Sequence, residues 1–128
     1  MDALTHALEA LVSNRANYVS DILATQAAID IIENLPKACA DGTDMKAREI
    51  MLQASMVAGM AFTNVSLGIV HSMAHTLGGV FHISHGLADA ILLPYVIRYN
   101  EADERAKKVY DIFAEKSVQR ICIQRLKG

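Results

Sequence analysis

The residues of this chain that are best suited to chemistry are its histidines, four of which fall within fifteen residues, at positions 71, 75, 82 and 85. The fifth, His6, lies four residues after Asp2. On a helix, that spacing places the two side chains on one face, about 5–6 Å apart. Imidazole and carboxylate are ligands of divalent first-row metals, and a catalytic site leaves one position open for water or substrate. The spacing therefore predicts a metal site, but it does not decide which histidines bind.

The same residues also have a purely structural interpretation. A single histidine on a helix is more often a hydrogen-bonded polar residue than a ligand, so the clustering carries the prediction. His82 taken alone is expected to lie in a loop or on the surface. Methionines recur at helical spacing, which is typical of flexible core residues rather than ligands; they are Met45, Met51, Met56, Met60 and Met73.

Apolar residues recur at helical spacing along nearly the whole chain, and no segment shows the sustained alternation of a β-strand. We therefore predict an all-α fold, a helical bundle of about six helices. Their expected ranges are 2–13, 20–40, 43–64, 66–77, 86–100 and a last helix beginning near 101.

Capping residues, proline and glycine predict where these helices begin and end. Ser20 is expected to cap the second helix, because its hydroxyl can accept a free backbone N–H of the first turn. Pro36 is expected to bend that helix or to end it early. The Gly78-Gly79 pair is expected to end the fourth helix, so that a chain reversal follows it.

The composition limits the class of protein. Apolar residues make up 52% of the chain and charged residues 20%, with a net charge of −2, so a core can form and no basic surface for nucleic acid is expected. No apolar run reaches the roughly 20 residues that a membrane helix needs, and the N-terminal residues lack the basic, apolar and small-residue pattern of a signal peptide. Cys39 and Cys122 lack metal or redox spacing and are expected to be free thiols. We expect a cytoplasmic protein whose apolar excess is covered in a homo-oligomer.

Three segments resemble one enzyme family. They are MDALTHALEALVS at 1–13, GMAFTNVSLGIVHSMAHTLGG at 59–79 and FHISHGLADAILLPYVIRYN at 81–100. Together they resemble the iron-dependent (group III) alcohol dehydrogenases, in the first part of the C-terminal metal-binding domain. The combination of DALTH, HSMAH and SHG at these separations is specific to that family, and the likeness runs from Met1 to about Asn100.

The resemblance implies roles for particular residues. In that family one Asp and three His bind the metal, and the matching positions here are Asp2, His6, His71 and His85. His75 matches a position beside the nicotinamide and the substrate that is implicated in proton relay, so it is expected to be catalytic and cofactor-binding. Phe62 matches an aromatic position that borders the substrate pocket in some relatives. The choice of His71 over His75 as a ligand comes from the resemblance alone.

The sequence departs from the family pattern at two positions near His85. Ser84 stands where the family usually has Pro, and Asp89 stands where it usually has Asn. Serine restrains the backbone less than proline does, because proline fixes one backbone angle. We expect metal binding to survive this change.

The function that the resemblance implies is NAD- or NADP-dependent interconversion of alcohols and aldehydes or ketones at an Fe²⁺ site, with Zn²⁺ or Mn²⁺ as alternatives. We expect residues 1–117 to form a partial helical metal-binding domain and residues 118–128 to form a tail unlike the family. No glycine-rich phosphate loop occurs, so the dinucleotide-binding domain is expected to be absent. The chain alone is then expected to be inactive, and to bind metal weakly through His6, His71 and His85.

Two other functions fit the same residues. The chain could be a non-catalytic helical assembly fragment that self-associates through exposed apolar faces, with idle histidines. It could also be a metal-dependent hydrolase on a helical scaffold, because His and Asp clusters serve such enzymes. The first alternative predicts oligomers without metal binding, and the second predicts ester or phosphate cleavage without nicotinamide.

Overall fold

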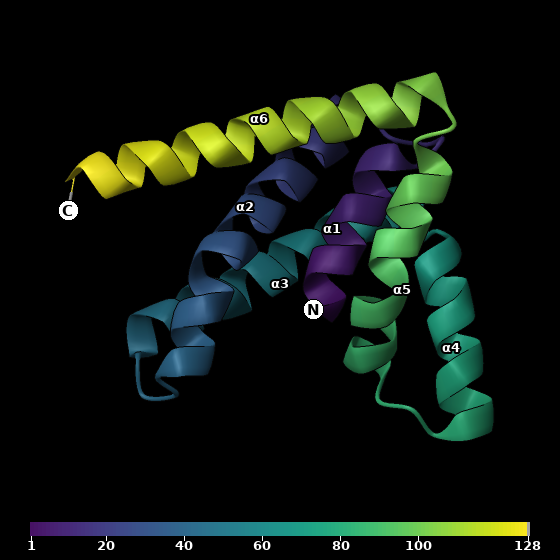
Figure 1. Ribbon diagram of the computed structural model, residues 1–128, viewed down its shortest axis with the longest axis horizontal. Helices are drawn as coiled ribbons and strands as arrows, with labels where there is room; N and C mark the ends of the chain where they lie inside the picture. The colour runs from purple at the N-terminus through teal and green to yellow at the C-terminus, as the bar shows by residue number, and fades with distance from the viewer. Residues whose placement is uncertain (128) are drawn as a thin grey trace.

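The computed structural model describes residues 1–127, with side chains described for residues 1–119, and it contains six helices within that part of the chain (Figure 1). The helices are α1 (Asp2–Val12), α2 (Tyr18–Ala40), α3 (Met45–Val65), α4 (Ile69–Phe81), α5 (His85–Asn100) and α6 (Glu104–Lys127). No strand occurs among the described residues. The predicted all-α helical bundle is confirmed.

Helix α1 is the centre of the bundle and packs against each of the other five helices. Figure 1 shows α2 and α3 running side by side on one flank of α1, the α4–α5 hairpin on the other flank, and α6 crossing one end. Alanines on the facing sides of α2 and α3 allow these helices to approach closely; they include Ala24, Ala27, Ala28, Ala54, Ala58 and Ala61. Side chains on the different faces of α1 therefore pack against neighbouring helices.

Helix α2 begins two residues earlier than predicted and ends at Ala40, as predicted. Its N-cap is Asn17, not Ser20: Asn17 accepts from the backbone N–H of Ser20, and the Ser20 hydroxyl accepts from the backbone N–H of Asn17. This reciprocal pair satisfies two free donors at once. Pro36 does not end the helix, which continues to Ala40, because the following turn still closes with the bond from the Asp41 N–H to the Lys37 carbonyl.

The predicted end of α4 at Gly78-Gly79 is wrong, since the helix passes through both glycines and ends at Phe81. The reversal comes at His82, which adopts a left-handed conformation with φ 55° and ψ 30° and donates its N–H to the Gly78 carbonyl. Residues 82–84 then turn the chain back into α5. His85 thereby becomes the first residue of α5, opposite α4.

Helix α6 is tied to the end of α1. The Arg105 guanidinium donates to the carbonyls of Val12 and Ser13, at 3.2 and 2.8 Å, and so satisfies carbonyls that α1 leaves free. The Asp103 carboxylate caps α6 by accepting from the Ala106 N–H. These hydrogen bonds, together with packing, hold the start of α6 against the C-terminal end of α1.

Four of the five methionines predicted as core residues are exposed instead: Met45, Met56, Met60 and Met73. Cys39 is an exposed free thiol, as expected, whereas the side chain of Cys122 lies outside the described residues. Within the described chain no single helix has the length and apolar composition to cross a membrane; only α3 and α4 together do, and they meet at a bend of 107°.

Candidate metal centre

The four residues expected as metal ligands come from three helices. Asp2 and His6 lie one turn apart at the start of α1, His71 lies in the first turn of α4, and His85 begins α5. Helix α1 packs against both arms of the α4–α5 hairpin. The centroid of the His71 ring lies 4.4 Å from that of His6 and 5.4 Å from that of His85, so side chains from all three helices meet.

The Asp2 carboxylate is the point on which the three imidazoles converge. Asp2 Oδ1 lies 3.2 Å from His71 Nε2, and 3.5 Å from the Nε2 atoms of His6 and His85. Two ligands that each lie about 2.1 Å from a tetrahedral ion are themselves about 3.4 Å apart. Each of the three imidazoles therefore lies at the distance from Asp2 that two ligands of one cation have.

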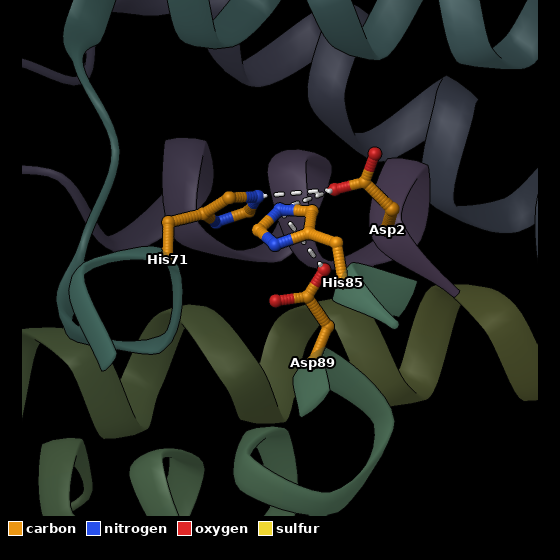
Figure 2. A group of neighbouring side chains, drawn as sticks. All are labelled: Asp2, His71, His85 and Asp89. Atoms are coloured by element: carbon orange, nitrogen blue, oxygen red, sulfur yellow. Dashed lines mark hydrogen bonds and ion pairs between the residues drawn. The ribbon is translucent and has the colours of Figure 1, made fainter. Parts of the chain in front are cut away.

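A second carboxylate, that of Asp89, joins this cluster from α5. Its side chain is fully buried, and its Oδ2 lies 3.6 Å from His85 Nε2. Figure 2 shows its carboxylate directed toward His85, and ligand atoms of Asp2, His71, His85 and Asp89 all lie within 4.8 Å of one another. In sequence Asp89 was noted only as a departure from the family. Its spacing of four residues from His85, the same as that of Asp2 and His6, is the signal that could have identified it.

His6 is held in place by rings on both sides. Its imidazole stacks on the Phe62 ring with a centroid distance of 4.2 Å, and on the His71 ring with a centroid distance of 4.4 Å. Phe62, which is half-buried on α3, therefore sits beside the cluster, where sequence reasoning expected a substrate contact. The observed contact is to His6.

Burial distinguishes His71 from His75, which spacing alone could not do. The His71 side chain is 2% exposed and faces Asp2, whereas His75, one turn later on α4, is exposed. The His75 ring lies 5.0 Å from the His85 ring in an edge-on arrangement, and 6.2 Å from the His71 ring. His75 thus borders the cluster without contacting Asp2.

Glu9, for which no role was predicted from the sequence, contacts His71 at the ring nitrogen that faces away from Asp2. The Glu9 carboxylate is buried, and its Oε2 lies 2.6 Å from His71 Nδ1. If Nδ1 carries the proton and donates to Glu9, the lone pair of Nε2 points toward Asp2, which is the tautomer a metal ligand needs. Asp2, His6 and Glu9 follow one helical face at intervals of four and three residues, and this pattern was the available signal.

The same carboxylate also fixes the start of α4. The backbone N–H groups of Gly68 and Val70 donate to Glu9 at 2.8 and 2.7 Å. A Cβ atom at Gly68 would lie 2.7 Å from Glu9 Oε1, so a side chain there would displace the carboxylate. Glu9 therefore positions both the helix and the imidazole that the helix carries.

Electrostatics couple Glu9 and His71. Burial alone would raise the pKa of the Glu9 carboxyl, but hydrogen bonds from His71 and from two backbone amides outweigh it and lower this pKa below its ordinary value. Burial alone would lower the pKa of the His71 imidazole, but its hydrogen bonds to Glu9 and Asp2 raise it. Without a cation, the two groups form a buried ion pair.

The pKa values of Asp2 and His6 are shifted toward the protonation states that a cation requires. Burial alone would raise the pKa of the Asp2 carboxyl, yet the neighbouring His6 and the hydrogen bond with His71 lower it, so Asp2 stays ionised. Burial lowers the pKa of His6, and the attraction of Asp2 offsets only part of this effect. A neutral imidazole and an ionised carboxylate are the forms that bind metal.

The Glu9–His71 pair predicts how the stability of the metal-free chain depends on pH. The pKa of Glu9 falls below its ordinary value of 4.5, so its contribution is present above pH 4.5 and lost as pH falls through the folded pKa. The pKa of His71 rises above 6.5, so its contribution is complete below pH 6.5 and lost as pH rises through the folded pKa. In thermal unfolding with a chelator, the unfolding temperature of the wild type should exceed that of Glu9→Gln by the largest amount between about pH 4.5 and pH 6.5. A constant difference at all pH values would contradict the pairing.

The donor set fits a divalent first-row metal. Three imidazole nitrogens and one or two carboxylate oxygens are suitable for Fe²⁺, Zn²⁺ or Mn²⁺, and contain no soft sulfur ligand. The carboxylate behind His71 supplies the outer support that metal-binding histidines usually have.

Comparison with known proteins agrees with the family resemblance that the sequence motifs indicate. Residues 1–125 match the family described as "Fe-containing alcohol dehydrogenase family, C-terminal". The chain is 57% identical, over 100 residues, to 1,3-propanediol dehydrogenase of Citrobacter freundii, a match that covers 78% of this chain and 26% of the relative. It thus spans about a quarter of that relative's length.

Solved structures resemble the bundle itself. A 1,3-propanediol oxidoreductase superposes with a TM-score of 0.79 at 43% identity, covering 92% of this chain and 37% of that structure. An iron-containing alcohol dehydrogenase from Thermococcus thioreducens superposes with a TM-score of 0.85 at 32% identity, covering 91% of this chain and 30% of that structure. The family match runs past residue 117, where sequence reasoning ended the domain, and the division at that position stays a prediction.

Proposed function

Because the chain belongs to the Fe-containing alcohol dehydrogenase family and matches its C-terminal region, we propose that it is the metal-binding part of an enzyme that interconverts alcohols with aldehydes or ketones, using NAD(H) or NADP(H). The family resemblance inferred from sequence motifs is confirmed. The observation that carries the proposal is the convergence of three imidazoles from three helices on the Asp2 carboxylate.

We assign the metal to Asp2, His6, His71 and His85. A bound divalent cation would supply Lewis-acid chemistry, lowering the pKa of an alcohol hydroxyl placed at its open position. The chain itself holds the ligands: Glu9 orients the His71 ring and the stack on Phe62 orients the His6 ring. Rigid placement of these groups is what the fold contributes to the reaction.

His75 and Phe62 are proposed to act on the substrate side. His75 is exposed, yet its ring lies against that of His85, so a ring nitrogen of His75 can take the hydroxyl proton of an alcohol and pass it to water. Phe62 would contribute an apolar wall beside His6. The substrates that suit this arrangement are small alcohols and the corresponding carbonyl compounds.

The nicotinamide cofactor does not fit the described residues alone. The chain carries no glycine-rich phosphate loop, and the described part contains no strand from which a dinucleotide-binding fold could be built. We propose that a separate nucleotide-binding domain faces His75 in the working enzyme. The 128 residues by themselves should bind metal without turning over substrate.

The test begins with chain stripped of metal by a chelator. After anaerobic loading with Fe²⁺, or loading with Zn²⁺ or Mn²⁺, dialysis and elemental analysis should recover about one ion per chain, because the described residues contain one such cluster. NADH oxidation with a short aldehyde should stay at background. Failure to retain any of these ions, or robust NADH-dependent turnover by this chain alone, would overturn the proposal.

A second candidate, self-association without catalysis, is favoured by one observation. The α4–α5 hairpin exposes a row of large apolar side chains, namely Val80, Phe81, Leu87, Ile91 and Tyr95. Burying such a row between copies would stabilise an oligomer. Light scattering showing an oligomer in a chain that retains no metal would favour this candidate over the first.

A further inference from the structure

We propose that Asp89 is a second carboxylate ligand of the same cation, so that two carboxylates and three imidazoles surround the metal. The inference rests on the metal site proposed above and adds a residue that the family resemblance does not include. It is carried by the position of Asp89, by its burial, and by the lack of a hydrogen-bond partner at either of its carboxylate oxygens.

The position of Asp89 is on the ligand side of His85. Its Oδ2 approaches His85 Nε2, the same nitrogen that faces Asp2, at 3.6 Å. Ligand atoms of one octahedral ion with bonds of about 2.1 Å lie about 3.0 Å apart when adjacent, and about 4.2 Å apart when opposite. Ligand atoms of Asp2, His71, His85 and Asp89 lie at most 4.8 Å apart, which is close to that range.

Glu9 and Asp89 are both buried carboxylates that contact a histidine of the cluster, but they contact different ring nitrogens. Glu9 contacts His71 through Nδ1, the nitrogen turned away from the cluster, and accepts two further backbone bonds. Asp89 contacts His85 through the inward nitrogen and accepts no hydrogen bond at either oxygen. Glu9 therefore positions a ligand from behind, whereas Asp89 occupies the place of a ligand.

Burial makes the lack of partners costly. The Asp89 side chain is fully enclosed, and no lysine or arginine among the described residues pairs with it. A buried carboxylate that makes no hydrogen bond, and that is paired only with a partly exposed imidazole, is disfavoured. A divalent cation would neutralise Asp2 and Asp89 together.

A second carboxylate has a consequence for metal choice. Carboxylate oxygen favours harder ions such as Mn²⁺, whereas imidazole suits Zn²⁺ and Fe²⁺. Five protein ligands also match an octahedral ion with one open position better than a tetrahedral one. Asp89 should therefore strengthen binding of Mn²⁺ relative to Zn²⁺.

The experiment measures Mn²⁺ affinity from the electron paramagnetic resonance signal of the free ion, and Zn²⁺ affinity by competition with a chromophoric chelator. The variants are Asp89→Asn, which keeps the shape and removes the charge, and Asp89→Ala, in case the amide disturbs folding. Asp111→Asn, on the exposed side of α6, is the matched control. Thermal unfolding of each variant is also recorded in a chelator.

Asp89→Asn and Asp89→Ala should each lose about 10- to 100-fold in Mn²⁺ affinity and less in Zn²⁺ affinity. Without metal, neither variant should unfold at a lower temperature than the wild type, because a buried charge has been removed. Wild-type Mn²⁺ affinity in both variants, or lower metal-free stability with an unchanged Mn²⁺-to-Zn²⁺ ratio, would overturn the role of Asp89 while leaving the metal site intact. A wild type that binds neither ion would overturn the proposed function and this inference together.

Discussion

Replacing His71 with alanine should abolish metal binding and lower the stability of the metal-free chain by about 3 kcal/mol. His71 is the one imidazole that contacts carboxylates at both nitrogens, Asp2 at 3.2 Å and Glu9 at 2.6 Å. Its removal takes a ligand from the cluster and leaves the buried Glu9 charge without its imidazole partner. Breaking such a pair from one side costs more than the pair itself contributes.

The measurements are calorimetric titration with Zn²⁺ and chemical unfolding in a chelator. His82→Asn is the matched control, since His82 is an exposed histidine outside the cluster and asparagine tolerates its left-handed backbone. The control should bind and unfold like the wild type. If His71→Ala still bound Zn²⁺ with the wild-type affinity, His71 would not be a ligand.

Replacing Glu9 with glutamine should weaken metal binding by about 10- to 100-fold, although Glu9 does not face the metal position. The carboxylate fixes which nitrogen of His71 carries the proton, and it anchors the first turn of α4. Glutamine keeps the size but donates as well as accepts, so it holds the required tautomer less firmly.

Gly68→Ala tests the same contact from the other side. Its Cβ would meet Glu9 Oε1 at 2.7 Å and push the carboxylate away from His71, so metal affinity should fall in the same direction. Gly59→Ala is the matched control, because a Cβ there meets nothing within 4 Å. That control should leave affinity unchanged and add up to about 1 kcal/mol of helix stability. Equal affinities in all three variants would show that Glu9 has no role in orienting His71.

The helices themselves could be predicted from sequence because their apolar spacing is regular. Their ends could not, where two signals compete. Ser20 is a good N-cap type, but Asn17 three residues earlier makes the reciprocal pair that satisfies more donors. Glycine occurs inside helices as well as after them, so Gly78-Gly79 indicated only a possible end, and the helix continues through both residues to Phe81.

The cluster could be predicted in part. Spacing paired Asp2 with His6, and the resemblance chose His71 over His75, a choice that burial supports. Glu9 and Asp89 were missed because a carboxylate on a helix is ordinarily solvated, and nothing local reveals that it is buried. Glu9 of α1 contacts His71 of α4, which is distant in sequence, whereas Asp89 contacts His85 one turn earlier in α5. Spacing could have placed Asp89 beside His85, and Glu9 on the helical face of Asp2 and His6, but it could not show that Glu9 contacts His71.

X-ray absorption at the zinc edge of the Zn²⁺-loaded chain addresses the convergence of the three imidazoles on a single ion. We expect only nitrogen and oxygen neighbours at about 2.0–2.2 Å, with outer-shell scattering from three imidazole rings. A spectrum that shows at most one imidazole, or sulfur at about 2.3 Å, would contradict a shared site for His6, His71 and His85.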